Sequence, residues 1–122
     1  MPADLHARQN EIRAEEERIL ERFGGRRQLM LTVIDVFLDS YPDTMRALDQ
    51  AVEGRDAEGL EEAAHKLKGA ICNLAWDASY YTAQYLETMG REKNWDEVDA
   101  TLAILKTEIE RFERILKAIA PP

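Results

Sequence analysis

The sequence predicts an all-α fold, an antiparallel four-helix bundle with an additional N-terminal helix. Apolar residues recur every three or four positions along most of the chain, and no stretch alternates apolar and polar residues as a strand does. Glycine and proline separate the periodic segments, so the loops between the predicted helices are short. Long amphipathic helices joined by short loops are typical of an antiparallel bundle.

Length and charge narrow the class of protein. The 122 residues fit a single domain. The formal net charge of −8 repels phosphate backbones and anionic lipid headgroups, so we expect neither nucleic acid nor a membrane surface as partner. No apolar run approaches the ~20 residues of a membrane helix, and no segment resembles a signal peptide. Together with the single cysteine, Cys72, which cannot form an internal disulfide, these features favour a cytoplasmic protein.

The first predicted helix covers about residues 3–23 and is rich in charge, with few apolar residues. Gly24 and Gly25 end it. They set the predicted boundary between an N-terminal helix or linker arm, residues 1–25, and the bundle, residues 26–122. The role of this helix is open among a cap on the bundle, a linker and a partner-docking arm.

Two short helices are predicted next. The first covers residues 26–40 and carries an apolar stripe of Leu29, Val33, Val36 and Phe37. Pro42 is expected to end it, because proline lacks the backbone N–H and disfavours a helical conformation at the preceding residue. The second helix ends at Gly54 and carries Met45, Leu48 and Val52.

The following helix is predicted from Ala57 to about Ala75, with Asp56 as its N-cap. At about 100° per residue, one apolar stripe must face the core: Leu60, Ala63, Ala64, Leu67, Ile71 and Leu74. His65 lies roughly 140° from the centre of that stripe, so it points toward solvent or the edge of the bundle. The residues on its side of the helix are Glu61, Lys68, Gly69 and Cys72.

Two more helices complete the predicted bundle. The helix over residues 77–89 ends at Gly90 and has on one side Ala78, Tyr81, Thr82, Tyr85 and Met89. Glu87 lies opposite that stripe, so we expect it outside the core, within reach of an ion pair with Arg91 one turn on. The last helix begins near residues 94–96 and has the clearest stripe: Val98, Leu102, Leu105, Ile109, Phe112, Leu116 and Ile119.

His65 is the candidate functional residue. An imidazole has a reference pKa of roughly 6.5, so much of it is neutral and nucleophilic near pH 7. Lys68, one turn along, places a cation where phosphoryl oxygens need one. Gly69 lets a partner come close, although glycine costs a helix roughly 1 kcal/mol relative to alanine. From periodicity alone, these residues equally fit a solvated histidine, ordinary surface charge and a close helix-packing point.

The segment Ala64-His65-Lys66-Leu67-Lys68-Gly69-Ala70, followed by Asn73-Leu74-Ala75, resembles the A-H-x-L-K-G-[SA] signature of histidine-containing phosphotransfer (HPt) domains. The resemblance covers roughly residues 20–116. It includes upstream Phe37, Tyr41-Pro42, Leu48, Ala51 and Asp56, and downstream Leu86-Glu87 and Gly90-Arg91. The chain departs from the family pattern at Ala75, where glycine is usual, and at Trp76, where a small residue is usual.

The resemblance implies a four-helix bundle that relays a phosphoryl group in two-component signalling, between receiver-domain aspartates or from a sensor kinase. Carried over by position, His65 is phosphorylated, Lys68 steadies the phosphoryl group and Gly69 clears space for the receiver. Glu87 occupies the position where Gln or Glu often hydrogen-bonds the histidine or its phosphate. The residues predicted to flank the docking surface are Glu61, Cys72, Trp76 and Arg91. Trp76, about 20° from His65 on an extrapolated helix, flanks that surface or closes the bundle end.

The predicted mechanism is a relay, in which Nε2 of neutral His65 attacks an aspartyl phosphate while the receiver supplies Mg²⁺. The chain then needs no cofactor of its own, and without a Gly-rich nucleotide loop it is a phosphoryl carrier, not an enzyme. The expected partner is a response-regulator receiver domain, a hybrid histidine kinase, or both. The start at Met1 suits a free-standing protein, whereas residues 20–25 resemble the stretch before the terminal HPt domain of a hybrid kinase. The last helix needs its stripe to close the bundle, which favours a monomer.

Two alternatives stay open at this stage. A non-catalytic helical bundle, acting as an interaction or adaptor domain, predicts a stable partner complex without phosphohistidine. A metal site ranks lower, because the only other histidine is His6, far away in sequence. Glu61 and His65 alone are too few ligands for a typical structural site, so no metal is expected.

Overall fold

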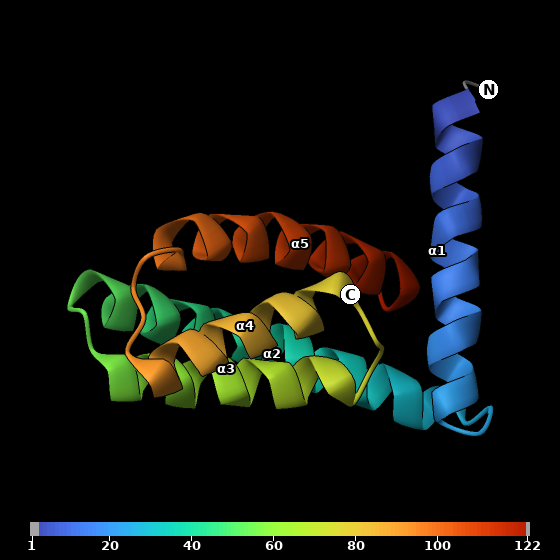
Figure 1. Ribbon diagram of the computed structural model, residues 1–122. Coiled ribbons are helices and arrows are strands. Elements are labelled where there is room, and N and C mark those ends of the chain that lie inside the picture. The colour runs from blue at the N-terminus through green and yellow to red at the C-terminus, as the bar shows by residue number, and fades with distance from the viewer. Residues whose placement is uncertain (1–2, 122) are drawn as a thin grey trace.

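Five helices make up most of the part of the chain that the computed structural model describes, residues 3–121. They are α1 (Ala3–Arg22), α2 (Arg27–Glu53), α3 (Ala57–Cys72), α4 (Ala78–Glu92) and α5 (Val98–Ile119). Helices α2 to α5 lie side by side along the long direction of the molecule, and α1 crosses one end of this bundle (Figure 1). The predicted four-helix bundle with an additional N-terminal helix is confirmed.

The core lies between the four bundle helices. Every residue of the two stripes predicted for α3 and α5 is buried, and Ile115 of α5 joins them. The N-cap prediction for α3 is also confirmed, since the side chain of Asp56 accepts a hydrogen bond from the backbone N–H of Gly59 at 3.0 Å. These two helices follow the periodicity because their inward faces are apolar throughout and few apolar residues lie elsewhere on the helix.

α2 continues through Pro42, so the prediction that this proline ends a helix is wrong. Proline inside a helix costs about 3 kcal/mol, because one backbone hydrogen bond is lost and the ring crowds the preceding turn. Large side chains on both sides of the proline, including Phe37 and Leu48, are buried in the same core. Burying each such side chain contributes about 1.5–3 kcal/mol, so one continuous helix is more stable than two that each lose part of this packing.

The buried face of α2 is also rotated from the predicted stripe. Leu29 and Val36 are exposed by 40% and 61%, whereas Met30 and Ile34 are fully buried. Phe37 belongs to both sets and packs edge-on against Phe112 of α5, with ring centroids 5.6 Å apart. The N-terminal half of α2 has apolar residues on more than one face. Periodicity alone therefore did not identify which of these faces is buried.

The buried face of α4 differs most from its prediction. Tyr81 and Tyr85, expected on the inward stripe, are exposed by 51% and 66%. The inward face consists instead of mostly small residues together with one carboxylate: Ser79, Ala83, Leu86, Glu87 and Gly90. Small residues allow two helix axes to approach closely, so the face that packs most tightly carries the weaker hydrophobic signal. The expectation that Glu87 lies outside the core is therefore wrong.

Gly90 lies where the backbones of α3 and α4 come close together. A Cβ atom at this position would lie 2.7 Å from the backbone nitrogen of Glu61 and 2.9 Å from the carbonyl oxygen of Ala57. Only glycine fits between these backbone atoms. The contact sets the spacing of the two helices one turn away from His65 and Glu87.

α1 packs across the bundle end with its C-terminal half. Ile19 is fully buried, and Ile12, Leu20 and Phe23 lie partly buried against the core. Gly24 and Gly25 make the turn into α2 with φ angles of +63° and +79°, a left-handed conformation that glycine adopts without strain.

Candidate functional site

His65 lies on the outer face of α3, where the sequence predicts it, and its side chain is 70% exposed. The opposite face of α3 is buried in the core, so packing of the helix turns the imidazole outward. Lys68 follows one turn later with a largely buried side chain, 19% exposed. The nucleophile candidate is thus accessible, while the nearest cation is held against the protein.

Glu87 of α4 lies beneath His65 and joins the two predicted residues of α3. Its side chain is only 6% exposed. One carboxylate oxygen, Oε2, lies 2.6 Å from Nδ1 of His65, and the other, Oε1, accepts a hydrogen bond of 2.6 Å from Nζ of Lys68. The close α3–α4 approach at Gly90 brings this carboxylate within reach, because Glu87 and Gly90 are neighbours one turn apart on α4.

The charge of Glu87 follows from its neighbours. Burial raises the pKa of the Glu87 carboxyl, but the hydrogen bonds and charges of Lys68 and His65 together outweigh it. The net pKa lies below its ordinary value of 4.5. Glu87 is therefore ionised at neutral pH, and a buried carboxylate is tolerated here because cationic and N–H groups surround it.

An ionised carboxylate can only accept hydrogen bonds, so Nδ1 of His65 must carry the proton that the 2.6 Å contact shares. In the neutral imidazole the lone pair then lies on Nε2, the ring nitrogen away from Glu87. The tautomer follows from the geometry of the pair and the charge of Glu87. A single buried acid thus orients the ring and selects which nitrogen is nucleophilic.

Arg91 forms a second, looser contact with the same carboxylate. Its Nη2 lies 3.7 Å from Oε2 of Glu87, and its Nε donates a 3.0 Å hydrogen bond to Oε2 of Glu61 on α3. The i,i+4 pair between Glu87 and Arg91 that the sequence predicts is present, but it is the longest contact of Glu87. Arg91 and Glu61 therefore form the border of the site near the C-terminal end of α4.

Gly69 is exposed, and a Cβ atom at this position would meet no atom within 4 Å. The helix-packing alternative for Gly69 therefore does not hold, and Gly90 has that role instead. No packing contact within the described residues requires glycine at position 69. The open space lies on the outer face of α3, one turn from His65.

Cys72 and Trp76 lie beyond Gly69, at the end of α3. The helix ends at Cys72, three residues before the predicted end, so the extrapolated angle between Trp76 and His65 does not apply. Trp76 lies in the loop before α4 and is 59% exposed. Its ring packs edge-on against Tyr80 at 5.2 Å, and the guanidinium of Arg22 lies 5.2 Å from its centroid.

The sequence contains no local signal for the contact of Arg22 with this end of α3. A basic residue in the last turn of a helix is ordinary, and its partner is 50 residues away along the chain. Within residues 3–121, no group of three or more His, Cys, Asp or Glu side chains is placed to hold a metal ion. None of the described helices is both long enough and apolar enough to cross a membrane.

The comparisons with known proteins agree with this geometry. The family model described as the Hpt domain matches residues 32–115, which is more than half of the chain. Among solved structures, the chain is similar to histidine-containing phosphotransfer protein B (HptB) from Pseudomonas aeruginosa PAO1. The TM-score is 0.75 at 19% identity, over 86% of this chain and 89% of that one. No curated protein matches the sequence.

The structural similarity shows the fold, and the family model shows the family. The matched range runs from the first half of α2 into α5 and includes His65, Lys68, Gly69 and Glu87. Hpt domains are phosphocarrier modules rather than kinases, and they serve histidine phosphotransfer in two-component systems alongside kinases and receiver domains. The chain, with its exposed histidine on the third helix of a helical bundle, belongs to the Hpt domain family.

Proposed function

We propose that this chain relays a phosphoryl group through His65 between receiver-domain aspartates, or from a sensor kinase to a receiver. The observation that carries the proposal is the 2.6 Å contact between Nδ1 of His65 and the buried, ionised carboxylate of Glu87. This contact leaves the Nε2 lone pair directed away from the protein on an exposed ring. A partner can therefore reach the nucleophile without any rearrangement of the bundle.

The transfer step balances within this arrangement. The Nε2 lone pair forms the N–P bond while the P–O bond of the partner's aspartyl phosphate breaks, and that electron pair returns to the aspartate carboxylate. The Nδ1 proton stays in place, so the phosphorylated ring becomes a cation. Glu87 stabilises this cation at 2.6 Å, as an acid held beside a histidine does in other nucleophilic sites. Transfer onward to a second aspartate is the same step reversed.

Lys68 supplies the positive charge for the phosphoryl oxygens. An ammonium group has three donors, and the structure uses one of them for Oε1 of Glu87. The remaining donors can bind phosphoryl oxygens, while the bond to Glu87 limits the freedom of the lysine side chain. On transfer the ring becomes a cation while the phosphoryl group brings a larger negative charge, so the site gains net negative charge, which the ammonium of Lys68 offsets.

Gly69 and the residues around it form the surface on which the partner docks. The absence of a side chain at Gly69 leaves room one turn from His65. We assign Glu61, Arg91, Cys72 and Trp76 to the edges of this docking surface, two at each end. The receiver contributes its own Mg²⁺, so the chain binds no cofactor. Because the α5 stripe is buried within the bundle, we propose that the chain acts as a monomer. We place this function in the cytoplasm.

The test is transfer of label from a ³²P-phosphorylated receiver domain to the purified chain. The wild-type chain should acquire an acid-labile, base-stable label, and His65→Gln should acquire none. His6→Gln is the matched control, because it removes the other histidine and should be labelled like the wild type. Undiminished labelling of His65→Gln would overturn the assignment. A stable complex without label would favour an adaptor domain instead.

A further inference from the structure

Arg22, in the last turn of α1, connects the first helix to the end of α3. Its guanidinium donates a hydrogen bond to the backbone carbonyl of Cys72, the last residue of α3. The same guanidinium lies 5.2 Å from the ring centroid of Trp76. A carbonyl at a helix C-terminus lacks an intrahelical partner, so a cation at this point is stabilised by both the carbonyl and the ring. Arg22 lies outside the range that the family model matches.

Trp76, Tyr80 and Arg22 form a small surface, here called the aromatic ledge, at the end of the α3–α4 pair that lies beyond Cys72. Cys72 is two helical turns beyond His65 on α3, and Tyr80 is two turns before Glu87 on α4. Both therefore lie on the His65 side, roughly 10 Å along the bundle. Trp76 packs against Tyr80, with centroids 5.2 Å apart, and leaves most of its ring exposed.

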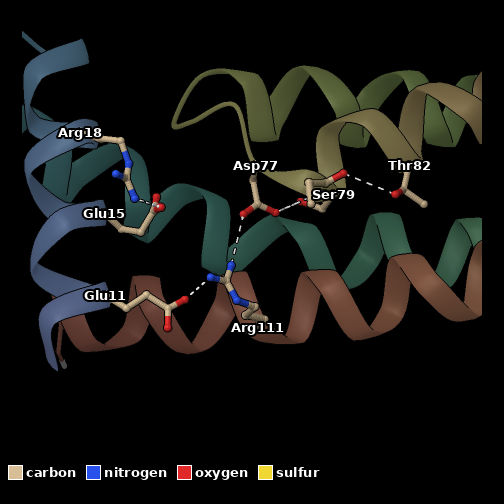
Figure 2. Close-up of polar contacts among 8 residues, drawn as sticks. Glu11, Glu15, Arg18, Asp77, Ser79, Thr82 and Arg111 are labelled. Atoms are coloured by element: carbon tan, nitrogen blue, oxygen red, sulfur yellow. Dashed lines mark hydrogen bonds and ion pairs between the residues drawn. The ribbon is translucent and has the colours of Figure 1, made fainter. Parts of the chain in front are cut away.

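A second set of contacts fixes α1 against this ledge. Figure 2 shows Arg111 of α5 between Glu11 of α1 and Asp77, the residue next to Trp76. Asp77 is also the N-cap of α4, where its side chain accepts a hydrogen bond from the backbone N–H of Ser79. Through these contacts, and through the buried side chain of Ile19, the position of α1 determines where Arg22 meets Trp76.

The ledge borders a cavity between α1 and the bundle. The cavity has a volume of about 410 Å³, and the residues along it include Arg18, Arg22, Trp76 and Arg111. Arg18 and Arg111 have carboxylate partners, whereas Arg22 forms no ion pair within residues 3–121. The ledge therefore offers an exposed aromatic ring, an unneutralised cation and an adjacent hollow. An apolar side chain flanked by a carboxylate fits this combination.

The charge of this side of the molecule points to the kind of partner. The chain as a whole carries −8, and Lys68 and Arg91 beside His65 are paired with Glu87 and Glu61. Arg22, at the end of α3, is the cation of this region that has no carboxylate partner within residues 3–121. A receiver that binds Mg²⁺ beside its aspartate holds the ion with carboxylate oxygens, so carboxylates lie in the part of the receiver that meets this chain. A specific interface buries about 800 Å² on each partner. An interface of this area centred on His65 extends roughly 10 Å beyond it and reaches the aromatic ledge.

We propose that α1 builds part of the receiver-docking surface: Arg22 holds Trp76 as an aromatic ledge that contacts an apolar side chain and a carboxylate on the receiver. The proposal rests on the phosphotransfer function proposed above. It makes Arg22 a positioning residue that acts on affinity and partner choice, and leaves the chemistry to His65.

Tryptophan fluorescence tests whether the receiver covers the ledge. Trp95→Phe leaves Trp76 as the single tryptophan, which is excited selectively at about 295 nm, beyond the absorption of tyrosine. Trp76→Phe leaves Trp95, which pairs with Arg55 at the far end of the bundle at 5.1 Å. Each variant is titrated with a tryptophan-free receiver domain that transfers to the wild type. We expect the emission of Trp76 to change as its exposed ring is covered, and that of Trp95 to stay constant. Unchanged Trp76 emission at saturating receiver would overturn the proposal.

Transfer kinetics test the role of Arg22. Arg22→Gln and Trp76→Ala should each raise the KM for the phosphorylated receiver about tenfold, with kcat within about twofold, because truncating a docking anchor weakens binding. Arg55→Gln is the matched control, since it removes the arginine from the other arginine–tryptophan pair and should leave KM unchanged. A purely structural role of Arg22 predicts a lower Tm with an unchanged KM, and that result contradicts the proposal.

Phosphoramidate, a small phosphoryl donor that needs no docking surface, separates this proposal from the function itself. Arg22→Gln, Trp76→Ala and Arg55→Gln should each be labelled by phosphoramidate at the wild-type rate, because none of these changes touches His65 or Glu87. If the wild type accepts phosphoryl from neither phosphoramidate nor a receiver, the phosphotransfer function fails and the ledge proposal fails with it. If the wild type accepts from the receiver and Arg22→Gln has the same KM, only the ledge proposal fails.

Discussion

Two glycines on the α3–α4 pair show how differently two neighbouring regions of this molecule use the same residue. Gly90 lies in the closed seam between the helices, where a Cβ atom would meet the backbone of Glu61 at 2.7 Å. Gly69 lies on the open face beside His65, where a Cβ atom would meet nothing within 4 Å. The seam needs glycine for folding, and the open face has no internal need for it. A helix-weakening residue without an internal reason indicates a surface shaped for something outside the chain.

Glu87 connects the two regions, because it is buried like the seam and bonded to the exposed His65. Glu87→Ala should have the largest effect, lowering the rate of phosphotransfer about a hundredfold, since the ring loses its orienting acid. Rates measured at saturating phosphorylated receiver would check this. Lys66→Ala, next to His65 on α3 but turned away from the site, is the control. A rate for Glu87→Ala within a few fold of the wild type would show that His65 accepts the phosphoryl group without help from the buried carboxylate.

Gly90→Ala should lower the free energy of unfolding by about 2 kcal/mol, because the added methyl group forces two backbones apart and overpacks the seam. Urea denaturation would measure the change. The same variant should also slow phosphotransfer, since separation of the helices moves Glu87 away from His65. If Gly90→Ala is as stable as the wild type, the seam is looser than the structure indicates.

The ionisation of Glu87 makes the free energy of unfolding depend on pH. Its folded pKa lies below 4.5, so the carboxylate contributes stability that is complete above pH 4.5 and is lost as the pH falls from there through the folded pKa. Glu87→Gln removes the titrating group. The difference in unfolding free energy between wild type and Glu87→Gln should therefore be largest near pH 7 and should shrink below pH 4.5. A difference that does not vary with pH would show that folding leaves the pKa of Glu87 unshifted, and a difference that grows below pH 4.5 would show that its pKa is raised.

Gly69→Ala should have the smallest effect on stability, and the effect should have the opposite sign to that of Gly90→Ala. Alanine favours a helix over glycine by roughly 1 kcal/mol, so the variant should be slightly more stable. Transfer from a receiver should nevertheless slow, while labelling by phosphoramidate should not, because the methyl group obstructs only a docked protein. Equal transfer rates for the variant and the wild type would remove the docking role of Gly69.

The parts of the fold that the sequence predicts well share one property. The stripes of α3 and α5 are apolar throughout, so a single face dominates and burial follows the period. The predictions for α2 and α4 were wrong where that dominance is missing. Pro42 is tolerated because packing on both sides outweighs its local cost, and the buried face of α4 is built from Ser79, Ala83 and Gly90, which contribute little apolar signal.

The sequence by itself determined the helical class and the outward direction of His65. It also identified Lys68 and Gly69 as the neighbours of His65, because these features depend on spacing within one helix. Only the tertiary structure decided that Glu87 lies buried beneath His65, that Gly90 brings the two helices together and that Arg22 reaches Trp76. Each of these contacts joins residues from different helices. Their geometry depends on how closely the helices pack, a quantity that the period of a single helix does not contain.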